Sequence, residues 1–343
     1  MKNTLIRPPQ IIIIIFLAAL TVTALYLHIP LNAMFGDSLV RLVMNGVLVL
    51  SLLPMLNAGI GLNFGLPVGV IAGLLGMCLA VNYHQTGWFG FAAAMFFSAL
   101  IAAAFGYLYA LLLNRVKGRE EIAATFVGFS FVSLMCLFWS VAPFKNPVML
   151  WPIGGKGMRL TVGLQGYFGK VLNNTWQFNI LGIKISLGLL IFFFVLCFLV
   201  YLIYKTKIGR AMLAVGENED FARLSGINVN RVKTLSVIFS TVLGALGICV
   251  YAQSYGFLEL YTAPLMMAFP AASAILIGGS TGGRTTIGQV ILGGYLYQAI
   301  YVISGPVANQ LLMPEFAEII RMLVTNSIIL YALLYGEGLR KNA

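Results

Sequence analysis

Apolar segments long enough to cross a bilayer recur along the whole chain, separated by short polar segments. A transmembrane helix needs ~20 predominantly apolar residues, and on this measure the chain contains about ten such helices. The expected spans are Ile11–Ile29, Ser38–Leu56, Ile60–Asn82, Trp88–Leu113, Ile122–Ala142, Ile183–Tyr204, Thr234–Tyr255, Leu265–Gly278, Thr286–Ile303 and Phe316–Leu334. The eighth is short enough to be a re-entrant or broken segment. The pattern therefore predicts an all-α, polytopic helical membrane protein, with residues 1–343 forming a single transmembrane domain.

Composition supports this class and argues against two others. The mean hydropathy is +0.95, and a soluble domain has too little polar surface to cover so many apolar side chains. The net charge of +11 is distributed between the spans rather than along a stripe, so a nucleic-acid partner is not expected. The four cysteines lie in apolar stretches without metal or disulfide spacing. Membrane lipid is the expected surrounding of this chain.

The basic residues indicate how the spans are oriented. If the N-terminus is cytoplasmic, segments on that side hold 14 of the 21 Lys and Arg residues. Most of the others fall in the long loop Pro143–Gly182, and loops of this length follow the positive-inside rule only weakly. We therefore expect both termini in the cytoplasm, residues 143–182 outside it and residues 205–233 inside it. The aromatic residues of the outer loop fit a docking or pore-covering role, and fit interfacial anchoring equally well.

The densest cluster of charge lies in the predicted cytoplasmic loop Lys205–Lys233. Gly216–Asp220 offers side chains that cap a short helix starting at Phe221, and Gly226 then ends that helix. Phe221 and Leu224 are three residues apart, so they share one helical face that could enter a groove on a partner protein. The alternative is a loop whose basic residues only fix the topology.

Glycine and proline residues interrupt the third expected span between Asn57 and Gly69. An interrupted helix frees polar backbone groups, which are tolerated at membrane depth only beside protein or a water-filled cavity. Asn57 and Asn63 add side-chain amides that packing alone does not require. The segment is therefore a candidate solute pathway, together with Gly61 and Gly65. The alternative is close helix packing, because Gly65 and Gly69 are four residues apart.

Residue patterns for catalysis, metal binding or nucleotide binding are missing from the sequence. Gly278–Arg284 is rich in glycine but lacks the Lys-Ser/Thr ending of a phosphate-binding loop, and no predicted strand precedes it. His28 and His84 do not form a pair at metal-ligand spacing. No Asp or Glu stands in the middle of an expected span, where ion-coupled carriers usually bind the driving ion. We expect no metal, no cofactor and no catalysis, and a transporter whose energy arrives from elsewhere.

The segment Ile208–Lys233 resembles the cytoplasmic loop of the permease subunits of ribose-type, binding-protein-dependent ABC importers. The family pattern is met at Gly216, Asn218, Ala222, Arg223, Gly226 and Ile227. Asn57–Gly65 and Gly278–Gly288 resemble two glycine-rich segments of the same family, so the resemblance extends from about Asn57 to the C-terminus. The loop is the more specific of these signals.

This resemblance implies that the loop supplies a coupling helix, which seats in an ATP-binding cassette ATPase subunit. The residues implied in that contact are Arg210, Gly216, Glu217, Asn218, Asp220, Phe221, Ala222, Arg223, Leu224, Gly226 and Ile227. It also implies a second permease subunit, identical or different, an extracytoplasmic solute-binding protein, and a multi-pass location in the bacterial cytoplasmic membrane. This chain has no Walker motif, so ATP hydrolysis is expected on the partner.

The activity implied by the resemblance is inward transport of a small polar solute, such as a sugar or a related furanose or nucleoside-like compound. The family often has Asp and Ser where this chain has Gly61 and Asn63, which puts an ordinary aldose in doubt if these positions face the solute. The alternative is an ion-coupled secondary transporter, which needs an intramembrane charge. A membrane-embedded enzyme would need a polar catalytic cluster at the interface, and a structural protein would need no interrupted helix.

Overall fold

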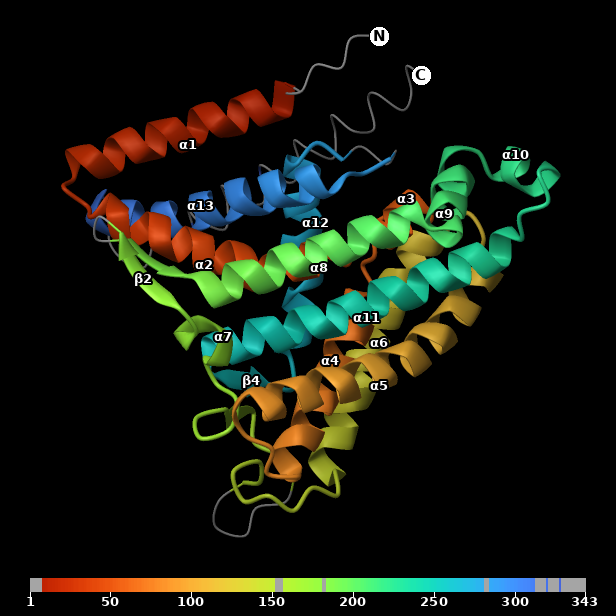
Figure 1. Ribbon diagram of the computed structural model, residues 1–343, viewed down its shortest axis with the longest axis horizontal. Coiled ribbons are helices and arrows are strands. Elements are labelled where there is room, and N and C mark those ends of the chain that lie inside the picture. Colours follow the sequence, from red (N-terminus) through yellow and green to blue (C-terminus); the bar gives the residue numbers. More distant parts are fainter. Residues whose placement is uncertain are drawn as a thin grey trace.

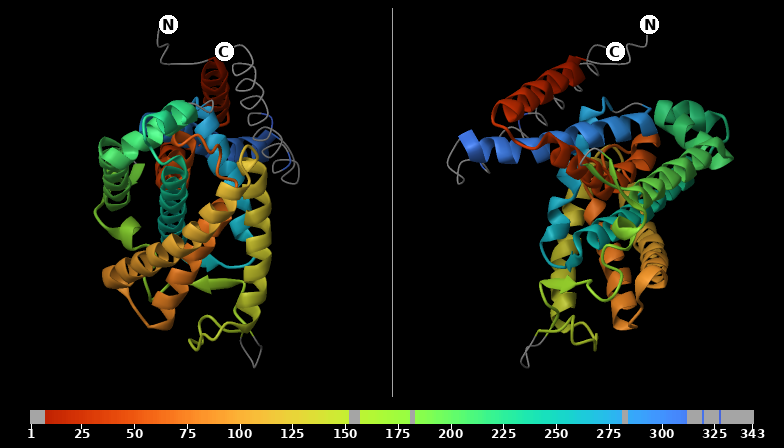
Figure 2. Two further views of the ribbon diagram at one scale, coloured as in Figure 1. Left: turned by 90° about the vertical axis from the view of Figure 1, so that its right-hand side faces the viewer. Right: turned by 60° about the vertical axis from the view of Figure 1, so that its left-hand side comes forward.

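The computed structural model describes residues 8–151, 157–180, 183–280 and 284–311, together with Ile319 and Ser327. Figure 1 shows five helices running across the molecule: α1, α2, α8, α11 and α13. Figure 2 shows the short elements η1 and α12 between α6 and α13, and they contact these helices. The elements are α1 (Pro8–Tyr26), α2 (Leu31–Leu50), α3 (Leu53–Asn57), α4 (Leu66–Asn82), α5 (Gly87–Arg115), α6 (Glu120–Val141), β1 (Thr161–Gly163), α7 (Val171–Asn174), β2 (Gln177–Ile180), β3 (Ile183–Ser186), α8 (Leu187–Lys205), α9 (Lys207–Glu217), α10 (Glu219–Leu224), α11 (Val229–Tyr255), β4 (Phe257–Glu259), η1 (Ala263–Met266), α12 (Ala268–Ile277) and α13 (Ile287–Leu311).

The expected helical spans agree with the observed helices wherever the chain is described. Nine of the ten expected spans fall on described residues, and each contains a helix. Six helices in this part of the chain are long and apolar enough to cross a membrane, and three shorter apolar helices accompany them. The tenth expected span, Phe316–Leu334, lies outside the described residues except for Ile319 and Ser327. The count of about ten spans therefore stays a prediction.

Several boundaries differ from the expectation. Helix α4 begins at Leu66 rather than Ile60, because Gly61 adopts φ +104° and Pro67 lies in the first turn of the helix. The sixth span starts as strand β3 and the eighth as the 3-10 helix η1. The described chain is mostly helical, as predicted, and its loops add two small antiparallel sheets that were not predicted, in which β1 pairs with β4 and β2 pairs with β3. The spans themselves are helical.

Helix α4 is the centre of the bundle, and nearly all of its side chains are buried, with α5 and α11 packed against it. Glycine residues make this close packing possible. A Cβ atom at Gly69 would lie 2.6 Å from the carbonyl oxygen of Thr241 on α11, and one at Gly73 would lie 2.7 Å from that of Ala245. Gly76 faces α5 in the same way. Such backbone contact provides the van der Waals packing that holds helices together in lipid.

The two longest loops between spans lie at opposite ends of α11 (Figure 1). Helices α9 and α10 gather near Val229, whereas β1 and β4 lie near Tyr255. The loop after α6 folds onto this second end, where Val162 pairs with Leu258 in the β1–β4 ladder. The predicted topology requires this separation. The side of the membrane on which each end lies stays a prediction.

Candidate functional site

Helices α9 and α10 form a capped pair whose ends can be explained residue by residue. The Thr206 hydroxyl accepts a hydrogen bond from the Gly209 amide at 3.3 Å, and the Asn218 carbonyl oxygen Oδ1 accepts one from the Phe221 amide at 2.9 Å. Side-chain caps of this kind satisfy amides that have no partner within a helix. Gly226 follows α10 with φ +80°, a conformation that favours glycine. The predicted cap and stop of the short helix are both correct, and the helix begins at Glu219 rather than Phe221.

The residues predicted to couple to an ATPase divide between an exposed apolar tip, its rim and a buried support. Phe221 and Leu224 are 66% and 89% exposed, which is unusual for large apolar side chains at the polar end of a helix bundle. Ala222 is fully buried and joins α10 to the rest of the protein. The other exposed members of the predicted set are Arg210, Glu217, Asn218, Asp220, Arg223 and Gly226, and the partly buried ones are Gly216 and Ile227.

An ion-pair network connects α10 to α11 and α6. The Lys233 ammonium lies 2.9 Å from a Glu219 carboxylate oxygen and 3.7 Å from a Glu120 oxygen, and Arg223 contacts Glu219 at 2.9 Å. The hydrogen bond from Lys233 and the charges of Lys233, Arg223 and Lys117 outweigh partial burial, so they hold the pKa of the Glu219 carboxyl below its usual range. The four-residue spacing of Glu219 and Arg223 could have predicted their pair from sequence. The contacts of Lys233 with Glu219 and Glu120 join residues far apart in the chain, so the sequence alone could not have predicted them.

Helix α9 touches the interrupted segment, defined here as residues 57–65. A Cβ atom at Gly216 would lie 2.9 Å from the Asn57 carbonyl carbon, so the two backbones are in direct contact. Asn57 also reaches across the protein: its Nδ2 donates to the Thr285 carbonyl at 3.0 Å, and its Oδ1 accepts from the Thr285 amide at 2.7 Å. The predicted coupling loop and the predicted pathway segment are therefore neighbours in space.

The Asn63 side chain is a buried cross-link between helices. Its Nδ2 donates to the Ser240 hydroxyl on α11 at 2.8 Å, and its Oδ1 accepts from the Tyr109 hydroxyl on α5 at 3.0 Å. Beside Gly61, the Leu62 amide donates to a Glu121 carboxylate oxygen on α6 at 2.9 Å. Such bonds satisfy polar groups that would be costly to bury alone.

The premise that the amides of Asn57 and Asn63 serve no packing need is therefore wrong, because both are 3% exposed or less and hydrogen-bonded within the chain. Gly65 lies against the Tyr109 ring and the backbone of Ala124, as the packing alternative requires. A contact of solute with these residues stays a prediction.

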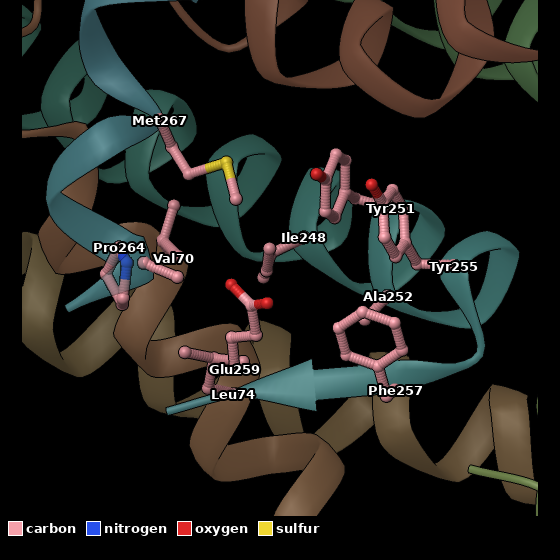
Figure 3. Close-up of a pocket in the computed structure, with 11 residues that line it drawn as sticks. Val70, Leu74, Ile248, Tyr251, Ala252, Tyr255, Phe257, Glu259, Pro264 and Met267 are labelled. Atoms are coloured by element: carbon pink, nitrogen blue, oxygen red, sulfur yellow. The ribbon is translucent and has the colours of Figure 1, made fainter. Parts of the chain in front are cut away.

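A cavity that the sequence did not indicate lies near the end of α11 opposite to α9 and α10. Tyr251 and Tyr255 on α11, Glu259 on β4 and Met267 before α12 surround a space of about 140 Å³ (Figure 3). The Tyr251 and Tyr255 rings stack with centroids 5.3 Å apart, and the Glu259 carboxylate points into the same space. The cavity therefore combines flat aromatic faces with one carboxylate.

A neighbouring space of about 470 Å³ shares Tyr251, Glu259 and Met267 and adds Arg41 and Gln298. The guanidinium carbon of Arg41 lies 5.4 Å from the centroid of the Tyr301 ring. We call the two spaces together the outer cavity, after the side of the membrane that the sequence predicts for this end of α11. Arg41 follows Ser38 within the expected apolar span Ser38–Leu56. An ionisable residue in such a place is a functional candidate, and this signal could have located the cavity.

Metal ligands do not gather anywhere in the described part of the chain, where no group of three or more His, Cys, Asp and Glu side chains is close enough to share an ion. The two sites offer aromatic, charged and amide groups in the outer cavity and exposed apolar side chains on α10. The outer cavity is large enough for a small polar molecule. The exposed apolar side chains of α10 can insert into an apolar groove of another protein.

Known proteins match this chain over most of its length. Residues 34–335 match the family model described as branched-chain amino acid transport system / permease component. A fructose import permease protein of Bifidobacterium longum is 26% identical over 265 residues, which cover 76% of this chain and 71% of that protein.

Two further relatives match over shorter segments. An autoinducer 2 import system permease protein of Yersinia enterocolitica is 28% identical over 240 residues, covering 69% of this chain and 59% of the relative. A ribose import permease protein of Haemophilus influenzae is 28% identical over 154 residues, covering 43% of this chain and 46% of the relative. The matched segments thus span less than two thirds of these two relatives. No solved structure matches the chain.

Proposed function

Because the chain belongs to the family of branched-chain amino acid transport system permease components, we propose that it is the membrane-spanning subunit of an ABC importer. Its energy comes from ATP hydrolysis on a separate ATPase subunit, and the chain itself is not catalytic. The observation that carries the proposal is the capped helix α10, which holds Phe221 and Leu224 in solvent. The sequence resemblance to ribose-type importers supports the same assignment.

The coupling surface consists of an apolar tip with charges around it. Phe221 and Leu224 would enter a groove of the ATPase, and Glu217, Asp220 and Arg223 would form the polar rim that is typical of protein interfaces. Movement of α10 would reach the membrane helices by two routes. One is the backbone contact of α9 with the interrupted segment, and the other is the Lys233 ion-pair network.

The solute enters through the outer cavity in this proposal. Aromatic faces, one guanidinium, one carboxylate and side-chain amides suit a small ring that carries several hydroxyl groups. The three relatives described above are import permeases for fructose, ribose and autoinducer 2, so a sugar or related furanose is the proposed class. A contact of Asn63 with solute requires its bonds to Ser240 and Tyr109 to break during transport.

The remaining partners follow from the family and from the surfaces left uncovered. A second permease subunit completes the pore, and a solute-binding protein docks on the outer loop 143–182. Residues 205–233 face the cytoplasm, as do both termini of a chain with about ten spans. Single cysteines in place of the exposed Asn174 and Ser225, in a chain without its native cysteines, should react with an impermeant reagent from opposite sides of the bacterial membrane. Reaction of both from one side would overturn this topology.

Co-purification with the ATPase tests the coupling surface. Phe221→Asp combined with Leu224→Asp should reduce recovery of the ATPase with the permease by more than tenfold, because two carboxylates would enter an apolar groove. Val116→Asp is a matched control, since Val116 is also an exposed apolar residue, at the end of α5. Both variants should insert and unfold at similar temperatures. Full recovery of the ATPase by the double variant would contradict the assignment of α10.

The ion-coupled alternative has one observation in its favour, because Glu259 places a carboxylate in the outer cavity. Uptake of labelled fructose and ribose by proteoliposomes distinguishes an ABC importer from an ion-coupled secondary transporter. An ABC importer needs ATP, the ATPase and the solute-binding protein, and an ionophore leaves its uptake unchanged. Uptake that needs only an ion gradient would instead establish a secondary transporter.

A further inference from the structure

A second cavity, of about 490 Å³, lies at the end of α8 that meets α9. Three cationic side chains line it: Lys205 at the end of α8, Arg210 in the first turn of α9, and Arg284 before α13. None of the described residues that line this space is Asp or Glu. The ion pairs within the described ranges use Arg223 and Lys233 instead. The positive charge of this basic cavity is therefore not neutralised by a carboxylate within the described protein.

One polar group in the wall of the basic cavity lacks a hydrogen bond. The hydroxyl oxygen of Tyr204 is buried and lies near the Asn57 side chain, but not in hydrogen-bond geometry. Asn57 is already bonded to Thr285 through both of its side-chain polar atoms. A buried hydroxyl without a partner costs free energy, which an acceptor oxygen placed in the cavity would recover.

An exposed aromatic strip on α8 leads to the same place. The rings of Phe198 and Tyr201 stack with centroids 6.5 Å apart, and the Lys205 ammonium lies 5.1 Å from the Tyr201 centroid. Phe198 and Tyr201 are 58% and 47% exposed, on a helix long and apolar enough to span a membrane. The strip thus runs from the apolar part of α8 to a cation at its end, as an acyl chain runs to its headgroup.

We propose that the basic cavity binds the phosphate group of an anionic phospholipid, with one acyl chain along Phe198 and Tyr201. Lys205, Arg210 and Arg284 would supply the charge, and the Tyr204 hydroxyl would donate to a phosphate oxygen. The aromatic strip favours a lipid over a soluble phosphate, because a free ion gains nothing from it. The orientation proposed above places this lipid in the cytoplasmic leaflet, and its binding does not depend on transport.

Native mass spectrometry of the purified permease tests this inference with phosphatidylglycerol and phosphatidylcholine as probes. Each juxtamembrane cation contributes about 1 kcal/mol, or about fivefold in affinity, so Lys205→Gln with Arg284→Gln should weaken phosphatidylglycerol binding by about 25-fold. Arg115→Gln is the matched control, because Arg115 is likewise an exposed cation in the last turn of a spanning helix, outside the cavity. It should bind like the unaltered protein.

Further arms of this experiment separate the other sources of binding. Tyr204→Phe should weaken phosphatidylglycerol binding without lowering the unfolding temperature, since it removes only the unpartnered hydroxyl. Equal retention of phosphatidylcholine would show an apolar groove only, and displacement of the lipid by inorganic phosphate would show a soluble-phosphate site. Either result, or unchanged binding by the double variant, would overturn the proposal. None of these readouts involves the ATPase, so failure here leaves the transport assignment intact.

Discussion

Replacing Gly216 with alanine tests whether α9 passes movement to the interrupted segment. The added Cβ would clash most closely with the Asn57 carbonyl oxygen, and it would lie 2.9 Å from the Asn57 carbonyl carbon and 3.2 Å from the Gly59 amide nitrogen. Non-bonded carbon atoms lie at ~3.5–4.0 Å, so the methyl group would push α9 away by roughly 0.6–1.1 Å. The contacted atoms belong to the backbone, so no side-chain rotation can relieve the clash. Overpacking of this kind costs about 1–3 kcal/mol.

The assay is a permease–ATPase complex in proteoliposomes, with phosphate release and uptake of labelled sugar measured together. The complex should still assemble, because Phe221 and Leu224 are unchanged. Hydrolysis should continue while uptake per ATP falls, because a displaced α9 no longer drives the membrane helices. If the whole cost of about 1–3 kcal/mol weakens the coupling of hydrolysis to transport, uptake per ATP falls by about 5- to 150-fold.

Gly305→Ala is the matched control for this prediction. It makes the same substitution in a helical glycine, but a Cβ at Gly305 would have no neighbour within 4 Å. Uptake per ATP should equal that of the unaltered protein. An unchanged ratio for Gly216→Ala would refute the reasoning, and so would loss of the complex in that variant.

Three further predictions concern single side chains. Lys233→Met should lower stability by about 1–2 kcal/mol, because it leaves the partly buried Glu120 without its cation. The Glu219 pKa is lowered on folding, so that group stabilises the protein above its unfolded pKa and the effect is lost as pH falls through the folded pKa. Thermal unfolding should therefore show a constant difference between variant and parent at pH 6–8, and a smaller one only below about pH 4. Asn63→Leu should cost about 1–3 kcal/mol, and an unchanged melting temperature would contradict the cross-link. Glu259→Gln should slow sugar uptake by less than about tenfold without altering its pH profile, whereas a proton-coupled carrier would lose its pH dependence.

Local features of the chain were predictable because their causes are local. The helix stop at Gly226 depends on one residue and its neighbours in sequence and was predicted correctly, and the cap, predicted within residues 216–220, is Asn218. The spans follow from apolar length alone. Helix boundaries were less predictable where Gly61 and Pro67 redirect the backbone, since composition does not fix where such a break ends.

The cross-links between helices could not be predicted, because they join residues far apart in sequence. The partners of Asn63 lie 46 and 177 residues away, and a single sequence gives no measure of such proximity. The same is true of the outer cavity, in which Arg41 lies over Tyr301. The premise that packing does not require the amides of Asn57 and Asn63 was wrong for this reason. An asparagine in an apolar span implies a partner, but does not identify it.

The glycine contacts of α4 determine where the protein can bend. Backbone packed on backbone leaves no side chain to change rotamer, so α4, α5 and α11 must travel as one rigid body. Alternating access then requires sliding at the margin of this body rather than within it. The outer cavity lies on that margin, with α4 and α11 on one side and η1 and Met267 on the other. A displacement of η1 and α12 against this body would therefore change the width of the outer cavity while the packing of α4, α5 and α11 on one another stays intact.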